Sequence, residues 1–192
     1  KTGNPVRQDL LEVSSKKQEA LRHFGLDPSK TTLAIVGGSL GAKVINETIA
    51  SHLEGLLTEN LQVLWQTGKL YYERFSPKGR KTGVHMHEYI QRMDLLYAAA
   101  DIIVSRAGAG TISELCIVGK PVIFIPSPNV AEDHQTKNAR SVTDKDAAVM
   151  IRESELETFM PVLLNLIKDS GRRQLLSQNI KKLALPDATG RI

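Results

Sequence analysis

DIIVSRAGAGTISEL, residues 101–115, joins an apolar strand-like run to a helical pattern through a loop of small residues. The strand expected at 101–105 carries successive apolar residues, which is typical of a strand buried on both faces of a sheet. The small residues 107–110 let the backbone come close to a ligand, and a helix beginning near Thr111 presents free amide groups there. The stretch therefore predicts a parallel α/β fold with an anion bound between a strand and the next helix.

Five other apolar runs have the length of a strand, and helical patterns lie between them. They cover residues 32–36, 61–65, 83–87, 121–125 and 147–151. This alternation predicts a parallel sheet of about six strands, covered by helices on both faces and connected by right-handed crossovers. Ligands of such sheets bind beyond the carboxyl ends of the strands, so we look for function in the loops that follow them.

Several helices are marked by their ends. Ser15 and Gln18 have the spacing of a capping box, and Gly25 is placed to end the same helix. The tail from about residue 156 to residue 192 is expected to be helical. Residues 76–83, SPKGRKTG, are expected to form an exposed loop.

Length and composition are those of a folded globular domain. The chain has 192 residues, 41% of them hydrophobic and 24% charged, which predicts one domain spanning residues 1–192. The net charge of +4 suits a phosphate-bearing ligand, although a solvated surface is the simpler explanation. The sequence has no run of about 18 apolar residues that could cross a bilayer. A start without Met and an end on DATGRI lead us to expect a fragment of a longer protein.

The residues that could bind metal give no metal site. Cys116 is the only cysteine, which excludes an internal disulfide and a cysteine-based zinc site, and its apolar neighbours predict a buried core thiol. His85 and His87 alternate on an expected strand without a third ligand. The Asp-Lys-Asp segment 144–146 precedes a strand, so we expect a solvated turn there.

Residues 37–42, GGSLGA, follow the first expected strand. The glycines allow a tight turn, and Ser39 offers a hydroxyl to a phosphate at the start of the next helix. Val36 stands where the dinucleotide fingerprint requires its first glycine, and no Gly-Lys-Ser/Thr follows as in a P-loop. A phosphate loop and a turn without a ligand are equally favoured by this segment alone.

Thr111 and Glu114 allow two interpretations. Their spacing is that of a capping box, which satisfies a helix end and is favoured on spacing alone. Alternatively, the Glu114 carboxylate lies one turn into the helix, where it could accept hydrogen bonds from the vicinal hydroxyls of a ribose.

Two further segments carry polar side chains suited to a sugar phosphate. His134, Gln135 and Asn138 lie on adjacent helical positions or one turn apart, and amides both donate to and accept from sugar hydroxyls. By themselves they are more simply an ordinary polar helix face. A helix is expected to begin after Asn4, and Arg7 in its first turn could serve an external phosphate or be solvated.

Taken together, GNPVR, GGSLGA, SRAGAGTISE and HQTKNA resemble, in order and spacing, the donor-binding half of the bacterial peptidoglycan N-acetylglucosaminyltransferases. The resemblance extends from residue 3 to residue 151. It implies a GT-B glycosyltransferase built of two facing Rossmann-like domains, of which this chain is the C-terminal one. The N-terminal acceptor domain is then absent from the chain.

The resemblance assigns contacts to the phosphates and the ribose of the donor. Arg7 and Ser39 match positions that contact the diphosphate, and Glu114 matches the carboxylate on the uridine ribose. The main chain that holds a phosphate at the helix N-terminus matches Ala109, Gly110 and Thr111. With this match, the ribose interpretation of Glu114 outweighs the capping box.

The resemblance also assigns contacts to the base and the sugar. Ile90 matches a residue whose main chain reads uracil, with Met93 close by. Gln135 matches an amide that holds N-acetylglucosamine, and Asn138 belongs to the same motif. His134 stands where many members carry a second glutamine, which bears on recognition of the sugar C4 hydroxyl.

The implied reaction belongs to peptidoglycan synthesis, and so to cell wall growth, shape and division. N-acetylglucosamine would move from UDP-N-acetylglucosamine to the C4 hydroxyl of undecaprenyl-pyrophosphoryl-N-acetylmuramoyl-pentapeptide, with inversion. Helix N-termini and Arg7 would stabilise the leaving diphosphate, with no cofactor and no metal.

The resemblance also divides the work between the two halves. The general base and the lipid-facing patch belong to the missing domain, so this chain is expected to bind the donor without carrying a catalytic residue. The full protein would be peripheral to the cytoplasmic face of the bacterial inner membrane and would have no nucleic-acid partner.

Other functions fit the same residues. Another GT-B nucleotide-sugar transferase or a sugar-nucleotide epimerase shares the two-domain fold, and a non-catalytic donor-binding subunit of a split enzyme would also lack a base. Val36 disfavours a nicotinamide dinucleotide domain. His134 acting as the base is the least favoured hypothesis.

Overall fold

The computed structural model describes residues 8–129 and 133–185 and contains two compact units. Residues 15–105 form the first, which holds strands β1 to β4 and is called the β1–β4 unit. The described residues 8–14, 106–129 and 133–185 form the second, which holds β5 and β6 and is called the β5–β6 unit. All strands lie where the sequence predicts them.

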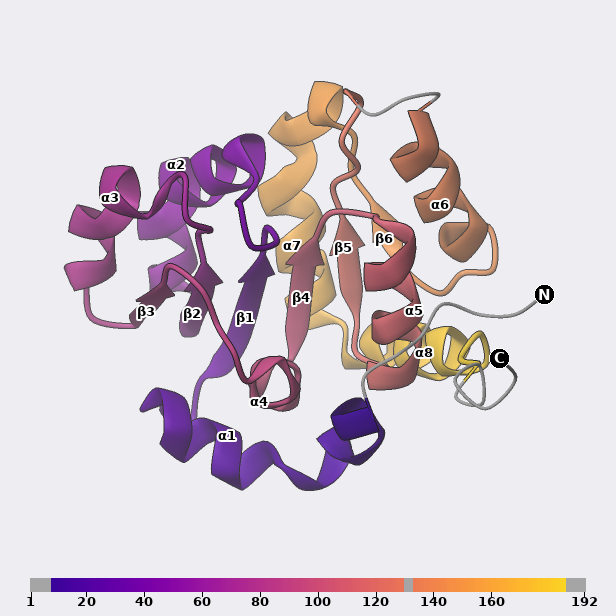
Figure 1. Ribbon diagram of the computed structural model, residues 1–192, viewed down its shortest axis with the longest axis horizontal. Helices are drawn as coiled ribbons and strands as arrows, with labels where there is room; N and C mark the ends of the chain where they lie inside the picture. Colours follow the sequence, from indigo (N-terminus) through magenta and orange to yellow (C-terminus); the bar gives the residue numbers. More distant parts are fainter. Residues whose placement is uncertain (1–7, 130–132, 186–192) are drawn as a thin grey trace. The chain divides into compact units, whose positions relative to one another are not determined.

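The β1–β4 unit is built on a parallel sheet in the order β3-β2-β1-β4, which Figure 1 shows. Leu33 on β1 pairs with Val63 on β2 and with Ile102 on β4. The strands are β1 (Thr31–Val36), β2 (Leu61–Gln66), β3 (Val84–His87) and β4 (Ile102–Ser105). Every residue of β2 and of β4 is buried, which explains their successive apolar residues and confirms the predicted parallel α/β fold.

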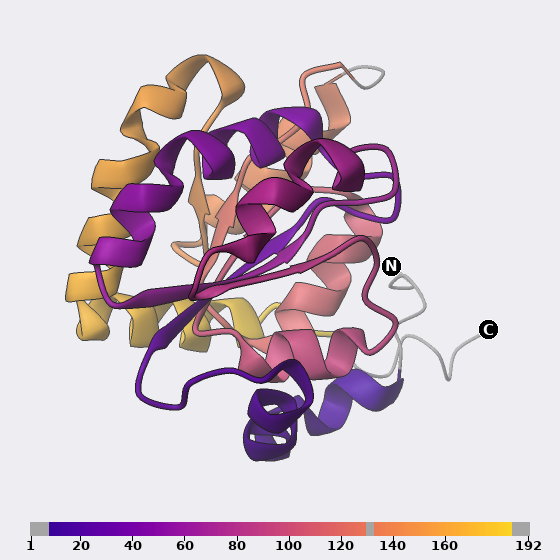
Figure 2. The same ribbon diagram turned by 90° about the vertical axis from the view of Figure 1, so that its left-hand side faces the viewer.

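Helices cover both faces of this sheet (Figure 2). α2 (Lys43–Thr58) and α3 (Tyr72–Phe75) lie on one side, and α1 (Lys17–Phe24) and α4 (Met93–Ala99) pack together on the other. A short 3₁₀ helix, η2 (Ser76–Arg80), occupies part of the segment predicted to be an exposed loop.

Helix α1 confirms one predicted end and corrects the other. Gly25 ends the helix in the left-handed conformation with a φ of 65°, as predicted. The N-cap is Lys16, which makes no side-chain capping bond, so the capping box predicted for Ser15 and Gln18 is wrong.

The β5–β6 unit contains β5 (Val122–Phe124) and β6 (Val149–Met150), which pair in parallel. Helix α5 contacts both α6 and α8. The helical elements are η1 (Gln8–Ser15), α5 (Ala109–Val118), α6 (His134–Thr143), η4 (Glu153–Thr158), α7 (Phe159–Lys168) and α8 (Ser170–Lys181). The tail is therefore helical as predicted as far as Lys181, with a break at Asp169, whose carboxylate accepts a bond from the Arg172 amide at 2.8 Å. Residues 182–185 are not helical, and residues 186–192 lie outside the described residues.

Two residue-level predictions outside the candidate site are confirmed in the β5–β6 unit. Cys116 is a free, buried thiol. Residues 144–146 form an exposed turn after α6, in which Asp146 makes a 2.7 Å ion pair with Arg172.

Candidate functional site

The loop after β1, residues 37–42, lies at the carboxyl end of that strand and leads into α2. Ser39 is exposed within it, as expected for a hydroxyl that meets a ligand. The N-cap of α2 is Ala42, which makes no side-chain capping bond. The first amides of α2 are therefore not capped by this residue, and the positive end of the helix dipole points into the loop.

Two glycines bring this loop against the loop that follows β2. A Cβ on Gly41 would lie 2.3 Å from the Thr67 carbonyl oxygen, and one on Gly68 would lie 2.1 Å from the Gly41 nitrogen. Both glycines also have φ near the left-handed region, at +94° and +81°. The backbone amide of Lys69 donates to the Ser39 carbonyl at 3.0 Å and closes the contact. Gly41 belongs to a segment that the sequence marks as a glycine turn, whereas no sequence signal marks its partner Gly68.

The segment after β3 carries Ile90, which is 4% exposed. Its amide donates to Oε1 of Gln66 at 2.8 Å, and Gln66 is the last residue of β2. Met93 is half-buried and begins α4. The two residues expected near uracil therefore flank the start of α4, and a buried side chain from β2 fixes one of them.

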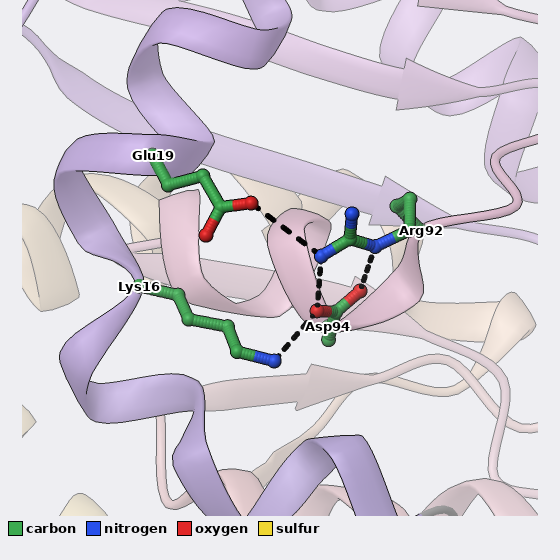
Figure 3. A network of polar contacts seen from close by, with 4 residues as sticks. All are labelled: Lys16, Glu19, Arg92 and Asp94. Atoms are coloured by element: carbon green, nitrogen blue, oxygen red, sulfur yellow. Dashed lines mark hydrogen bonds and ion pairs between the residues drawn. The ribbon is translucent and has the colours of Figure 1, made fainter.

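A network of charged residues fixes the start of α4, as Figure 3 shows. Asp94 is 1% exposed and accepts hydrogen bonds from Nε and Nη2 of Arg92, at 2.9 and 2.8 Å, and from Nζ of Lys16, at 2.9 Å. Glu19 on α1 lies 3.6 Å from the Arg92 guanidinium. The bonds from Arg92, and then those from Lys16, hold the pKa of Asp94 well below its usual range.

In the β5–β6 unit, α5 begins earlier than predicted. It starts at Ala109 with Gly108 as N-cap, and no side-chain capping bond is made. Thr111 is therefore the third helical residue and not the N-cap, so the capping-box interpretation of Thr111 is wrong. The first helical bond runs from the Ile112 amide to the Gly108 carbonyl at 2.9 Å, which places the amides of residues 109–111 before it.

The surface of this helix end is open. Ala109 and Gly110 are exposed, and a Cβ added to Gly110 would meet no atom within 4 Å. Glu114 is half-buried on the following turn. The helix end therefore combines backbone donors, small side chains and a carboxylate. The donors suit a phosphate, and the carboxylate suits a pair of sugar hydroxyls.

Helix α6 is tied to the segment that leads into α5. Oε1 of Gln135 accepts the amides of Ala107 at 3.2 Å and Ser127 at 2.9 Å, and Nδ2 of Asn138 donates to the Ala107 carbonyl at 3.1 Å. These amides thus hold the backbone beside the α5 end, a role that the sequence did not predict. His134 is exposed at the first position of α6.

Two arginines in the candidate segments could in principle bind a phosphate. Arg106 comes directly before the α5 loop, but its Nη1 lies 2.7 Å from Glu153 and donates to the Ile125 carbonyl at 3.0 Å, so its charge is already balanced. Arg7 lies outside the described residues. Within residues 8–129 and 133–185, no group of three or more His, Cys, Asp or Glu residues could hold a metal ion.

The candidate residues form one group in each unit. Ser39, Ile90 and Met93 belong to the β1–β4 unit, where Gln66 and the loop after β2 connect their segments. The β5–β6 unit holds the others, and there α6 is bonded to the start of α5. They are Ala109, Gly110, Thr111, Glu114, His134, Gln135 and Asn138.

Residues 32–192 match the model of the glycosyltransferase family 28 C-terminal domain. Relatives from Flavobacterium psychrophilum and Christiangramia forsetii are each 55% identical to the chain and align with 98% and 100% of it. Both are named UDP-N-acetylglucosamine–N-acetylmuramyl-(pentapeptide) pyrophosphoryl-undecaprenol N-acetylglucosamine transferase. The chain spans about half the length of these curated relatives, 52% of each.

Solved structures agree with this similarity. MurG of Acinetobacter baumannii superposes with a TM-score of 0.73 at 28% identity, over 89% of this chain and 50% of that one. A UDP-GlcNAc 2-epimerase from Neisseria meningitidis, solved with UDP-GlcNAc, has a TM-score of 0.65 at 14% identity, over 94% of this chain and 47% of that one. The second likeness shows the fold alone.

Proposed function

Since this chain belongs to the family of glycosyltransferase family 28 C-terminal domains, we propose that it is the donor-binding half of a peptidoglycan N-acetylglucosaminyltransferase. The full protein would move N-acetylglucosamine from UDP-N-acetylglucosamine to the C4 hydroxyl of undecaprenyl-pyrophosphoryl-N-acetylmuramoyl-pentapeptide. The names of the relatives at 55% identity support this reaction, and the length of those relatives supports a second half that binds the acceptor.

The observation that carries the proposal is the beginning of α5. Its first amides precede any helical bond, its exposed residues are small, and Glu114 lies one turn further on. The N-cap of α5 is Gly108, which has no side chain to cap these amides. A nucleotide diphosphate supplies both the anion and the vicinal hydroxyls that such an end would bind.

Each unit would contact different parts of the donor. In the β1–β4 unit, the backbone of Ile90 with Met93 would bind uracil, and Ser39 would bind the diphosphate. In the β5–β6 unit, residues 109–111 would bind a phosphate and Glu114 the ribose. The remaining polar residues would face the sugar, and they are His134, Gln135 and Asn138.

The chemistry that these residues would perform is stabilisation of the leaving group. In inverting transfer, negative charge develops on the nucleoside diphosphate that leaves. The N-terminus of a helix is the positive end of a fixed dipole, so it can stabilise this charge without reorganisation. Arg7 would add a full charge, and the proposal includes no metal and no cofactor. The base that deprotonates the acceptor would belong to the other half.

The full protein would bind the acceptor and associate with the membrane. In the part of the chain that the structure describes, no helix is both long and apolar enough to span a bilayer. We place the full protein peripherally on the cytoplasmic face of the inner membrane, where the undecaprenyl-linked acceptor would be reached through the other half.

Replacement of the Glu114 carboxylate tests the proposal. In the full-length protein that contains this chain, Glu114→Ala should weaken binding of UDP-N-acetylglucosamine about tenfold, as expected for lost hydrogen bonds to a charged group. Isothermal titration calorimetry measures the change, and Glu157→Ala, at an exposed position on η4, is the control. Unchanged donor affinity in a folded Glu114 variant would contradict the ribose role, and no binding to the wild type would contradict the proposed function.

A further inference from the structure

Gln66 ends the second strand of the β1–β4 unit between the ends of two other strands. In the register of the sheet it pairs with Val36, the last residue of β1, and with His87, the last residue of β3. Both neighbouring strands end beside Gln66, and the chain leaves the sheet there. The loop 37–42 is the exit after β1, and the segment that carries Ile90 is the exit after β3.

The side-chain amide of Gln66 spans both exits. Its Nε2 donates to the Gly38 carbonyl at 3.3 Å, and its Oε1 accepts the Ile90 amide at 2.8 Å. The residue is 2% exposed, so water does not compete freely for either bond. A side-chain amide offers a donor and an acceptor in one rigid plane, which is what this bridge uses.

The backbone that follows Gln66 repeats the same bridge. The amides of Thr67 and Gly68 donate to the carbonyls of His87 and Glu88, each at 3.0 Å, while the Lys69 amide donates to the Ser39 carbonyl at 3.0 Å. The two exits are therefore joined by bonds from Gln66 and from the three residues that follow it.

We propose that Gln66 is a positioning residue that couples the loop 37–42 to the Ile90 segment, so that the phosphate end and the base end of the donor bind cooperatively. The inference rests on the proposed function, which assigns the diphosphate to Ser39 and the base to Ile90. Binding of phosphate at the loop fixes the Gly38 carbonyl, which fixes the amide of Gln66 and hence the Ile90 backbone. By linkage, binding of the base favours phosphate binding to the same extent.

Gln62 provides a matched control on the same strand. It lies four residues earlier, on the same face of β2, and is 1% exposed. Its amide also makes a bridge, with Nε2 donating to the Asp27 carbonyl at 2.8 Å and Oε1 accepting the Asp27 amide at 2.9 Å. This bridge lies at the amino end of β2, opposite the end where the candidate residues lie.

The test compares Gln66→Met with Gln62→Met in the full-length protein. Methionine keeps the length of the side chain and removes both polar arms, so both variants should lower the melting temperature. The affinity for uridine is measured by calorimetry with and without saturating inorganic diphosphate. We expect diphosphate to increase uridine affinity at least about fivefold in the wild type and in Gln62→Met, and less than about twofold in Gln66→Met.

The outcomes separate this inference from the proposed function. A Gln66→Met protein that keeps the full effect of diphosphate overturns the coupling, as does a wild type in which diphosphate has no effect on uridine affinity. Failure of the wild type to bind uridine or UDP overturns the proposed function instead. Steady-state kinetics adds a second readout, since Gln66→Met should raise the KM for UDP-N-acetylglucosamine while kcat changes little.

Hydrogen exchange of the wild type decides the question if Gln66→Met does not fold. Inorganic diphosphate alone should then slow exchange in peptides covering residues 88–93, because it fixes the partner of the Ile90 amide. Exchange there that is insensitive to bound diphosphate overturns the coupling.

Discussion

Cys116 shows how burial decides the chemistry of a single residue. Burial raises the pKa of its thiol to about 11, and the charge of Lys145 lowers it only slightly. Since the thiolate is the reactive form, iodoacetamide at pH 8 should label this residue at least about 100-fold more slowly in the native protein than in urea. Mass spectrometry of the Cys116 peptide over time measures both rates, and rapid labelling of the native protein would contradict a core thiol.

At the same scale, the sequence predicts residue types better than residue partners. The burial of Cys116 follows from its apolar neighbours and is confirmed. Gln66 gives no such signal, because its bonds to Gly38 and Ile90 cross to loops on either side of its strand. Gln135 was placed in a sugar-binding motif, which stays a prediction, but its bonds to two backbone amides depend on the fold and could not be predicted.

Asp94 on α4 is bonded to Lys16, the N-cap of α1, and these two helices pack together. Arg92 and Lys16 hold the pKa of Asp94 well below its usual range, so the carboxylate adds stability above its unfolded pKa of about 3.9 and loses it as the pH falls toward the folded value. Asp94→Asn should lower the free energy of unfolding by about 2 kcal/mol at pH 7, with a smaller difference from the wild type below about pH 4. Urea unfolding of the full-length protein across this pH range measures both.

Glu47→Gln is the matched comparison for this element. It removes an exposed ion pair with Arg74 of the same 2.9 Å length, and should cost less than about 0.5 kcal/mol. If Asp94→Asn and Glu47→Gln behaved alike at every pH, the buried network would have no special role in holding α4.

The strands and the C-terminal end of α1 were predictable at the element scale, whereas the N-terminal ends of α1 and α5 were not. Gly25 ends α1 in the left-handed conformation, which glycine adopts at little steric cost, and Gly119 ends α5 in the same way. The start of α5 is different, because Gln135 and Asn138 hold Ala107 from another helix. An N-terminus fixed by tertiary contacts does not need the side-chain cap that the spacing of Thr111 and Glu114 indicated.

For the whole molecule, alternation of strands and helices was enough to predict a parallel α/β fold, since buried parallel strands must be apolar in succession. The division into two compact units was not predictable. It falls between Ser105 and Arg106, inside one of the motifs, and no change of composition marks it. The residues proposed to bind the donor lie in both units, so the proposed function assigns some donor contacts to each of them.

Producing this chain without the rest of its protein tests whether it binds the donor while the other part supplies the acceptor site and the general base. The chain is 52% of the length of its relatives, and the proposed function leaves the acceptor and the general base to the other part. Residues 1–192 produced alone should bind UDP-N-acetylglucosamine in calorimetry and transfer less than about 1% as much radiolabelled sugar to the lipid acceptor as the full-length protein, since removal of a general base alone costs about 100-fold or more. Transfer by the chain alone would place the base within it, and loss of that transfer in His134→Ala would then identify the residue.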